Sequence, residues 1–141
     1  MNKKELKLFL DEKAIQYENN DFIPHDPIQI PHRFELKEDI EISAFLTATI
    51  AWGNRKSIIT NATKMMDIMG NTPYDFIINY NPEDSDLFNG FVHRTFNSLD
   101  LETFVRSLQS IYKNHGGLEN AFVSGITKDG LQPAISNFKK L

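Results

Sequence analysis

Apolar residues recur with the period of an α-helix along most of the chain, and the pattern is most regular between Asp39 and Gly70. The first stripe of this stretch consists of Ile42, Phe45, Leu46, Thr49 and Ile50. The second consists of Ile58, Ala62, Met65 and Met69, flanked by Ile59 and Met66. Between them, Gly53 suits the left-handed end of a helix and Asn54 can cap the next one. The stretch therefore predicts a helical hairpin with a two-residue turn.

Small residues on the other sides of the first helix indicate that it is central. Ala44, Ala48 and Ala51 permit a second helix to approach closely, so we expect this helix to be covered on more than one face. Ser43 and Thr47 form a narrow polar line, and we expect their hydroxyls to bond back to the preceding turn. The methionines of the second helix can form either an adaptable binding surface or core, and we interpret them as core.

Further helices are predicted on both sides of the hairpin. Lys3 to Tyr17 is expected to turn Leu6, Phe9, Leu10 and Tyr17 inward. Thr72 and Pro73 predict the start of a short helix that runs through Ile78, with threonine as the cap. Asp100 is expected to cap a helix whose inner stripe is Leu101, Phe104, Val105, Leu108, Ile111 and Tyr112. Leu118 to Val123 adds one or two turns, whereas Leu87 to Phe96 does not decide between strand and irregular structure.

A proline-rich segment, FIPHDPIQIPHRF over residues 22–34, separates the first helix from the hairpin. Each proline removes a backbone donor and favours an extended residue before it. We therefore predict an extended arm, and its apolar residues indicate that it packs across the helices. The predicted fold class is all-α: a compact bundle of about six helices around the Asp39 to Gly70 hairpin.

The end of the chain carries one more apolar stripe, made of Leu131, Ala134, Ile135, Phe138 and Leu141. Domains usually finish with polar residues. We therefore expect residues 1–141 to form a single helical domain that is either the N-terminal fragment of a longer protein or bound through this stripe to a protein partner or a second copy.

Composition restricts the classes of function. The net charge of −4 is unfavourable for a general polyanion binder. The chain has no cysteine, which excludes disulfides and cysteine nucleophiles within it and fits a cytoplasmic location. Since no apolar run approaches about 18 residues, we expect no membrane association.

Candidate catalytic or metal-binding groups are few. His25 and His32, with Asp26 nearby, have no recognised ligand spacing, so we expect surface or hydrogen-bonded histidines and predict no metal site and no cofactor. Asp39 and Glu41 are two apart on a helix and do not face one another. There is no glycine-rich phosphate loop, nucleophile elbow or HExxH motif. Catalytic residues are therefore not identified, and enzymatic activity is left open.

The pair His-Arg occurs twice beside an aromatic residue, as His32-Arg33-Phe34 and as His93-Arg94-Thr95-Phe96. A cation beside an aromatic ring can bind phosphate or a nucleobase, or it can tie a loop to carbonyls or carboxylates. Asn54 and Arg55 at a helix start can hold an anion or form a plain cap. Arg33, Asn54, Arg55, His93 and Arg94 are thus the candidate anion or nucleic-acid contacts, and a functional site requires Arg33 and Arg94 to meet the Asn54–Arg55 corner. His115 has no assigned role.

The segments HDPIQIPHRF, DIEISAFLTATIAWGNRKSI and NGFVHRTFNSLDLETFVRSLQSIYKNHGGLENAF resemble the uncharacterised bacterial family catalogued as domain of unknown function 2400. The resemblance covers nearly all of the chain. It implies a longer protein, whose second half carries a KRLN-type helix and a PLD-H motif similar to the helix-hairpin-helix DNA glycosylase superfamily. Asp39 to Gly70 would then resemble early helices of that fold, and the catalytic lysine or aspartate would lie beyond Leu141.

Two hypotheses of different classes follow. The first is a nucleic-acid-associated helical protein, indicated by the resemblance and by Arg33, Arg55 and Arg94. The second is a non-catalytic helical interaction module, indicated by the acidic balance and the terminal apolar stripe. A small-molecule enzyme ranks third, supported only by the unassigned histidines.

Overall fold

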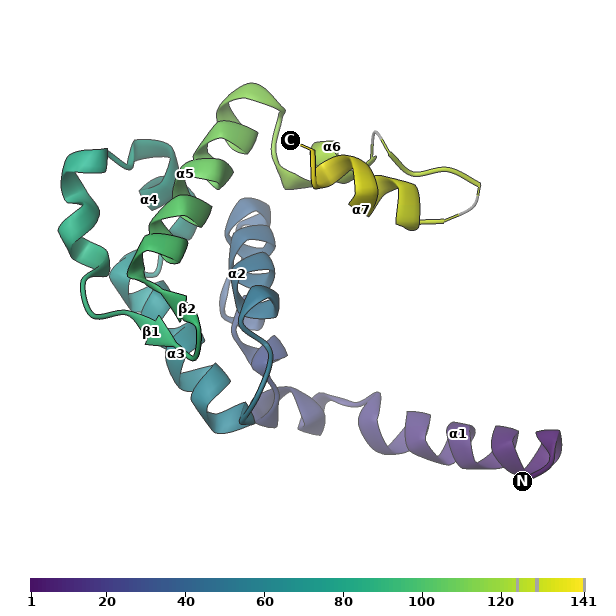
Figure 1. The fold of residues 1–141 in the computed structure, drawn as a ribbon. Helices are drawn as coiled ribbons and strands as arrows, with labels where there is room; N and C mark the ends of the chain where they lie inside the picture. Colours follow the sequence, from purple (N-terminus) through teal and green to yellow (C-terminus); the bar gives the residue numbers. More distant parts are fainter. Residues whose placement is uncertain (124, 129, 141) are drawn as a thin grey trace.

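The computed structural model describes residues 1–123, 125–128 and 130–140, and within them the chain is all-α apart from one small hairpin, as predicted (Figure 1). The α-helices are α1 (Lys3–Tyr17), α2 (Lys37–Thr49), α3 (Arg55–Ile68), α4 (Pro73–Asn79), α5 (Ser98–Asn114), α6 (Leu118–Val123) and α7 (Gln132–Phe138). The 3₁₀ helices are η1 (Asn20–His25), η2 (Pro27–Gln29), η3 (Pro31–Arg33) and η4 (Pro82–Phe88). Strands β1 (Val92–His93) and β2 (Phe96–Asn97) form an antiparallel hairpin in which His93 pairs with Phe96. No helix in the described part is long and apolar enough to cross a membrane.

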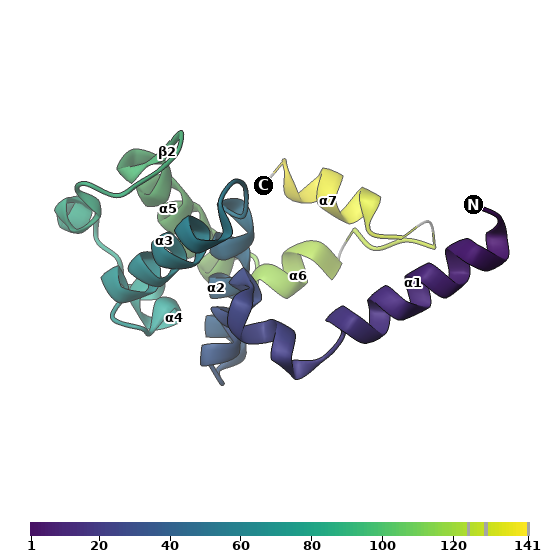
Figure 2. The same cartoon turned by 90° about the horizontal axis from the view of Figure 1, so that it is seen from below.

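Helix α2 lies at the centre of the packing. It contacts α3, α4 and α6 as well as η2 and η3, which confirms the prediction of a helix covered on several sides (Figures 1 and 2). Its inner residues Ile42, Leu46 and Ile50 are at most 1% exposed. They belong to one core with the α3 methionines Met65 and Met66, which are fully buried, so the interpretation of the methionine stripe as core is confirmed.

The pair α2 and α3 confirms the predicted helical hairpin, but residues 50–54 join the helices, rather than a two-residue turn. Gly53 has a φ of +107°, and the Asn54 side chain accepts a hydrogen bond from the Ser57 amide at 3.2 Å, as expected for a glycine stop and an asparagine cap. The three extra residues are Ile50, Ala51 and Trp52, which follow the end of α2 and precede Gly53.

The polar line on α2, formed by Ser43 and Thr47, is buried. Ser43 is fully buried and its hydroxyl donates to the carbonyl of Ile40 at 3.1 Å, which confirms the expected bond to the preceding turn. Thr47 is 3% exposed and its hydroxyl has no partner among the described residues. Close approach at the alanines comes from η2 and η3, which line a groove against α2 with Ala44, Ala48 and Ala51.

The proline-rich segment is not an extended arm, so that prediction was wrong. It forms the three consecutive turns η1, η2 and η3. The prolines at the starts of η2 and η3 supply the φ near −65° that a 3₁₀ turn also uses, and Asp26 caps η2 by accepting from the Ile28 amide at 3.1 Å. Ile30 is fully buried, which confirms that the segment packs across the helices.

Helix α1 confirms the predicted bounds but not the predicted inner face. It has no buried residue among Lys3–Tyr17, and both views show it projecting away from α2 and α5 (Figures 1 and 2). Leu6, Phe9, Leu10 and Tyr17 are between 41% and 54% exposed. The helix starts with a capping box of Asn2 and Glu5, so local hydrogen bonds define its N-terminus.

Helix α5 buries the predicted stripe, with Leu101, Val105 and Leu108 at most 1% exposed. Its cap is Asn97, not Asp100 as predicted. Asn97 accepts from the amides of Leu99 and Asp100, and the Asp100 carboxylate accepts from the Asn97 amide at 2.9 Å, which completes a capping box. The undecided segment before it contains η4 and the β1–β2 hairpin.

The C-terminal stripe is only partly buried. In α7, Ala134 is fully buried, whereas Leu131 and Ile135 are 61% and 53% exposed. The Phe138 ring stacks on Phe122 of α6 with a centroid distance of 4.3 Å. The last member of the stripe, Leu141, lies outside the described residues.

A buried carboxylate on α2 caps α4. Thr72 makes no capping hydrogen bond, contrary to the prediction, because its hydroxyl donates to the Met69 carbonyl instead. Asp39, 8% exposed, accepts from the Tyr74 amide in the first turn of α4 at 2.8 Å. A tertiary contact thus replaces the local cap, and it fixes α4 against α2.

We expect Asp39→Ala to lower the free energy of unfolding by about 2 kcal/mol, since it removes a charged acceptor and leaves the Tyr74 amide without a partner. Glu38→Ala removes an acid from the same first turn of α2 and should cost less than about 1 kcal/mol, the size of a helix-dipole term. Urea unfolding of the two variants makes the comparison. Equal losses would contradict a special role for the Asp39 contact.

Candidate functional site

The strongest candidate lies where the β1–β2 hairpin meets the connection between α2 and α3. Arg94 and Thr95 form the hairpin turn, and the Arg94 guanidinium lies over the Trp52 ring at 4.7 Å from its centroid. Trp52 is 40% exposed and Arg94 is exposed. A cation and a large aromatic face are therefore presented together at the surface.

The buried side chain of His93 supports the contact between Arg94 and Trp52. It is 2% exposed, and both ring nitrogens have partners: Nδ1 lies 3.0 Å from the Asn61 amide nitrogen on α3, and Nε2 lies 3.3 Å from the Trp52 carbonyl oxygen. Because the Trp52 carbonyl can only accept, Nε2 donates and Nδ1 accepts from Asn61. The ring also meets Trp52 edge-on at 6.0 Å. His93 thus positions the site and is itself hidden from a ligand.

Gly53 is required at this contact for two reasons. Its φ of +107° is unfavourable for other residues, and a Cβ at this position would come 2.9 Å from an Arg94 guanidinium nitrogen. The turn therefore provides the space in which Arg94 reaches Trp52.

The five candidates do not all converge. His93 and Arg94 meet the turn that Asn54 closes, whereas the Asn54 side chain itself is engaged as a helix cap. Arg55 is exposed, and its guanidinium lies 4.0 Å from the Asp26 carboxylate. Arg33 donates to the Gln29 side chain at 3.1 Å, and no described contact joins it to the Asn54–Arg55 corner. The corner therefore contains the second His-Arg pair but not the first.

Basic residues extend from this corner along α3. Lys56, Thr60 and Lys64 follow at intervals of four and share one exposed stripe. Residues 50–66 and 87–99 contain Arg55, Lys56, Lys64 and Arg94 and no Asp or Glu. The rest of the chain holds 11 basic against 19 acidic side chains, because the whole chain has 15 and 19. We call these four cations and the Trp52 ring the basic face.

A shallow groove continues the basic face toward η1. Its volume is about 350 Å³, and its lining includes His25, Arg55 and Lys56. His25 thus gains a cationic neighbourhood that its position in the sequence did not indicate. Asp67, one residue beyond the acid-free segment, bonds to Asn71 at 3.3 Å at the far end of α3.

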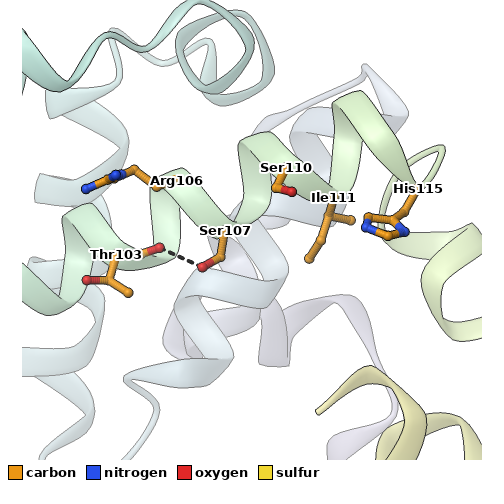
Figure 3. A pocket seen from close by; sticks show the side chains of 6 residues that line it. All are labelled: Thr103, Arg106, Ser107, Ser110, Ile111 and His115. Carbon is orange, nitrogen blue, oxygen red and sulfur yellow. Dashed lines mark hydrogen bonds between the residues drawn. The ribbon is translucent and has the colours of Figure 1, made fainter. Parts of the chain in front are cut away.

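A second concavity, which sequence reasoning missed, runs along α5. Its volume is about 460 Å³, and Figure 3 shows its lining on one side of the helix: Thr103, Arg106, Ser107, Ser110, Ile111 and His115. The Thr103 and Ser107 hydroxyls each donate at 2.8 Å to the carbonyl four residues earlier, and Arg106 lies 3.9 Å from Glu102. The two hydroxyls are therefore occupied within the helix, whereas the contact of the Arg106 guanidinium is longer than a hydrogen bond. The repeat of Thr and Ser at intervals of three and four is the signal that could have revealed the groove.

Two tyrosines have raised pKa values for structural reasons. Burial, followed by the charge and hydrogen bonding of Glu102, raises the pKa of Tyr80 to about 12. Burial also raises the pKa of Tyr112, whose hydroxyl donates to Glu41 at 2.8 Å. Both phenols stay protonated at neutral pH, so they serve packing between helices rather than proton transfer.

Ligand sets for metals are absent from the described ranges: no three His, Asp or Glu side chains cluster there. Asp26 serves as a helix cap and lies near Arg55, and these contacts account for the acid between the two histidines. No bound ion is needed to explain its position.

Comparison with known proteins identifies the family. No curated protein and no solved structure matches the chain. The family described as "Protein of unknown function (DUF2400)" matches residues 26–141, which include η2, η3, α2, the basic face and α5. The chain therefore belongs to the DUF2400 family.

Proposed function

We propose that this protein associates with nucleic acid through the basic face. The observation that carries the proposal is charge segregation along the sequence: residues 50–66 and 87–99 hold four cations and no acid, in a chain whose net charge is −4, and the neighbouring acids Asp26 and Asp67 lie at the two ends of α3. Phosphate recognition depends on local positive charge, and a face of lysine and arginine side chains is its usual form.

The individual cations on this face are available for phosphate. Arg55, Lys56 and Lys64 are exposed. Lys64 has a long contact to the Gly90 carbonyl, at 3.5 Å, and lies 5.9 Å from the centroid of the Phe91 ring, and Arg55 has one carboxylate at 4.0 Å. Contacts of this length leave the ammonium and guanidinium donors largely free, and exposed ion pairs contribute little.

The sequence resemblance supports the same class of partner. The segments that resemble the DUF2400 family include α2, the Asn54–Arg55 corner and the His93–Arg94 turn. The resemblance implies a similarity to helix-hairpin-helix DNA glycosylases through motifs of that family that lie outside these segments. We propose that the helices around α2 correspond to the early helices of such a fold. The chain's own residues would then bind nucleic acid, and no catalytic residue is assigned among them.

The alternative is a non-catalytic interaction module, and α1 is the observation that favours it. The helix exposes an apolar stripe of Leu6, Phe9, Leu10 and Tyr17, whose described aromatic contact is that of Tyr17 with Phe22 of η1 at 5.9 Å. Exposed apolar surface of this kind is typical of protein–protein interaction sites. Leu131, which precedes α7, and Ile135 within it are also exposed and form a separate apolar surface.

Binding of labelled DNA, single-stranded and duplex, should weaken as salt increases, with a linear fall of log affinity against log salt. The double variant Lys56→Gln/Lys64→Gln should reduce that slope by about 2, since each phosphate contact contributes about 1. Fluorescence anisotropy across a salt series measures both quantities.

The matched control is Lys4→Gln/Lys113→Gln, which removes the same charge from exposed positions on α1 and α5. It should leave the slope unchanged. An affinity independent of salt, or equal losses in the two double variants, would refute phosphate recognition by the basic face.

The interaction module predicts self-association through the α1 stripe, seen as a sedimentation coefficient that rises with concentration. Phe9→Gln should abolish the rise, because Phe9 is 48% exposed on the stripe. Leu8→Gln should not, because Leu8 is 61% exposed on the opposite side of the helix. A concentration-independent monomer, or equal effects of the two substitutions, would count against self-association by this stripe.

A further inference from the structure

We infer that Trp52 and Arg94 form a stacking site for an unpaired nucleobase, so that the protein prefers single-stranded nucleic acid to duplex. The inference rests on the proposed function, nucleic-acid binding, and specifies that the bound nucleic acid is single-stranded. The two side chains present flat surfaces together: the planar guanidinium lies 4.7 Å from the ring centroid, and Trp52 keeps 40% of its surface exposed. Aromatic rings and guanidinium planes are the surfaces on which single-strand binders stack bases.

The site is fixed before any ligand arrives. The Trp52 backbone accepts from buried His93, whose other ring nitrogen is held by Asn61 on α3. This hydrogen bond fixes the Trp52 backbone, and the edge-on contact with the His93 ring at 6.0 Å restricts the indole side chain. A fixed aromatic ring loses little conformational freedom on binding, which favours affinity.

The backbone at Arg94 is unusual for an arginine. Its φ is +56°, in the left-handed region, at the first central position of a two-residue hairpin turn where glycine is favoured. Such a conformation is unfavourable for a residue with a Cβ and tends to occur at functional sites. The conformation directs the side chain over Trp52, and Gly53 leaves room for it.

The neighbouring charges suit a strand that passes across the stack. Lys56 and Lys64 lie on the adjacent stripe of α3, and Arg94 itself adds a charge beside the ring. In a duplex the bases are stacked on each other and their faces are closed to the protein. In a single strand a base can turn onto Trp52 and Arg94 while its phosphates lie against the lysines.

Trp52 is the single tryptophan of the chain, so its fluorescence reports directly on the site. Titration of the whole chain with a thymidine oligonucleotide of about 16 nucleotides, near the upper site size of single-strand binders, should quench this fluorescence to saturation. Anisotropy should give an affinity for the single strand about tenfold above that for a duplex of equal length.

Two variants separate stacking from folding. Trp52→Leu should lower single-strand affinity about tenfold, toward that for the duplex. Arg94→Gly removes the guanidinium and relieves the left-handed backbone, so it should retain the helical circular dichroism and thermal transition yet lose the single-strand preference. Lys113→Gln on α5 is the control and should change neither.

The possible results distinguish failure of the stacking site from failure of the proposed function. Salt-dependent binding with unquenched Trp52, equal or tighter binding of duplex, or unchanged single-strand affinity in Trp52→Leu would each overturn the stacking site and leave phosphate recognition by the basic face standing. Absence of binding to both forms at low salt would overturn the proposed function itself.

Discussion

The structure depends on the burial of α2 from several directions. Ile42, Leu46 and Ile50 on one side are sealed by α3, α4 and α6, and η2 and η3 contact the helix as well. One side of α2 carries large apolar residues and another carries alanines. Different elements contact the two sides, α-helices the first and the turns η2 and η3 the second. Asp39 and Glu41 extend this arrangement beyond apolar contact. One caps α4 and the other accepts from Tyr112 of α5, so two further helices are oriented by hydrogen bonds from α2.

The candidate site is an extension of the same packing. Because α3 is fixed by its buried methionines, Asn61 presents a fixed donor to His93, and His93 in turn fixes the connection that leaves α2. The exposed pair of Trp52 and Arg94 is therefore connected to the core through a single buried side chain, that of His93. The buried hydrogen bond from His93 restricts the motion of the Trp52 backbone. A binding surface that is fixed in this way can bind a ligand without rearrangement.

Local signals in the sequence predicted much of this fold. Contacts between residues that are far apart in the sequence were not predicted. Gly53, Asn54 and the methionine stripe follow rules that operate within a few residues, and they were interpreted correctly. The failures have two causes. The prolines of residues 22–34 were read as extension, although proline φ fits a 3₁₀ turn equally well and Asp26 supplies a cap. Asp39 capping α4, and His93 meeting Asn61, join residues more than thirty positions apart, so neither leaves a local pattern.

Net charge averages over the molecule, so a net charge of −4 does not exclude a local phosphate site. Charges farther apart than a screening length, about 8 Å at physiological salt, hardly influence one another. What a phosphate meets is therefore the set of side chains within that distance. On α3 and the hairpin turn that set contains Lys56, Lys64 and Arg94, with Asp26 beside Arg55 at one end of α3 and Asp67 at the other. An acidic chain can hold a local phosphate site when its sequence keeps acids out of two segments that the fold brings together, and residues 50–66 and 87–99 meet that condition through the His93–Asn61 and Arg94–Trp52 contacts.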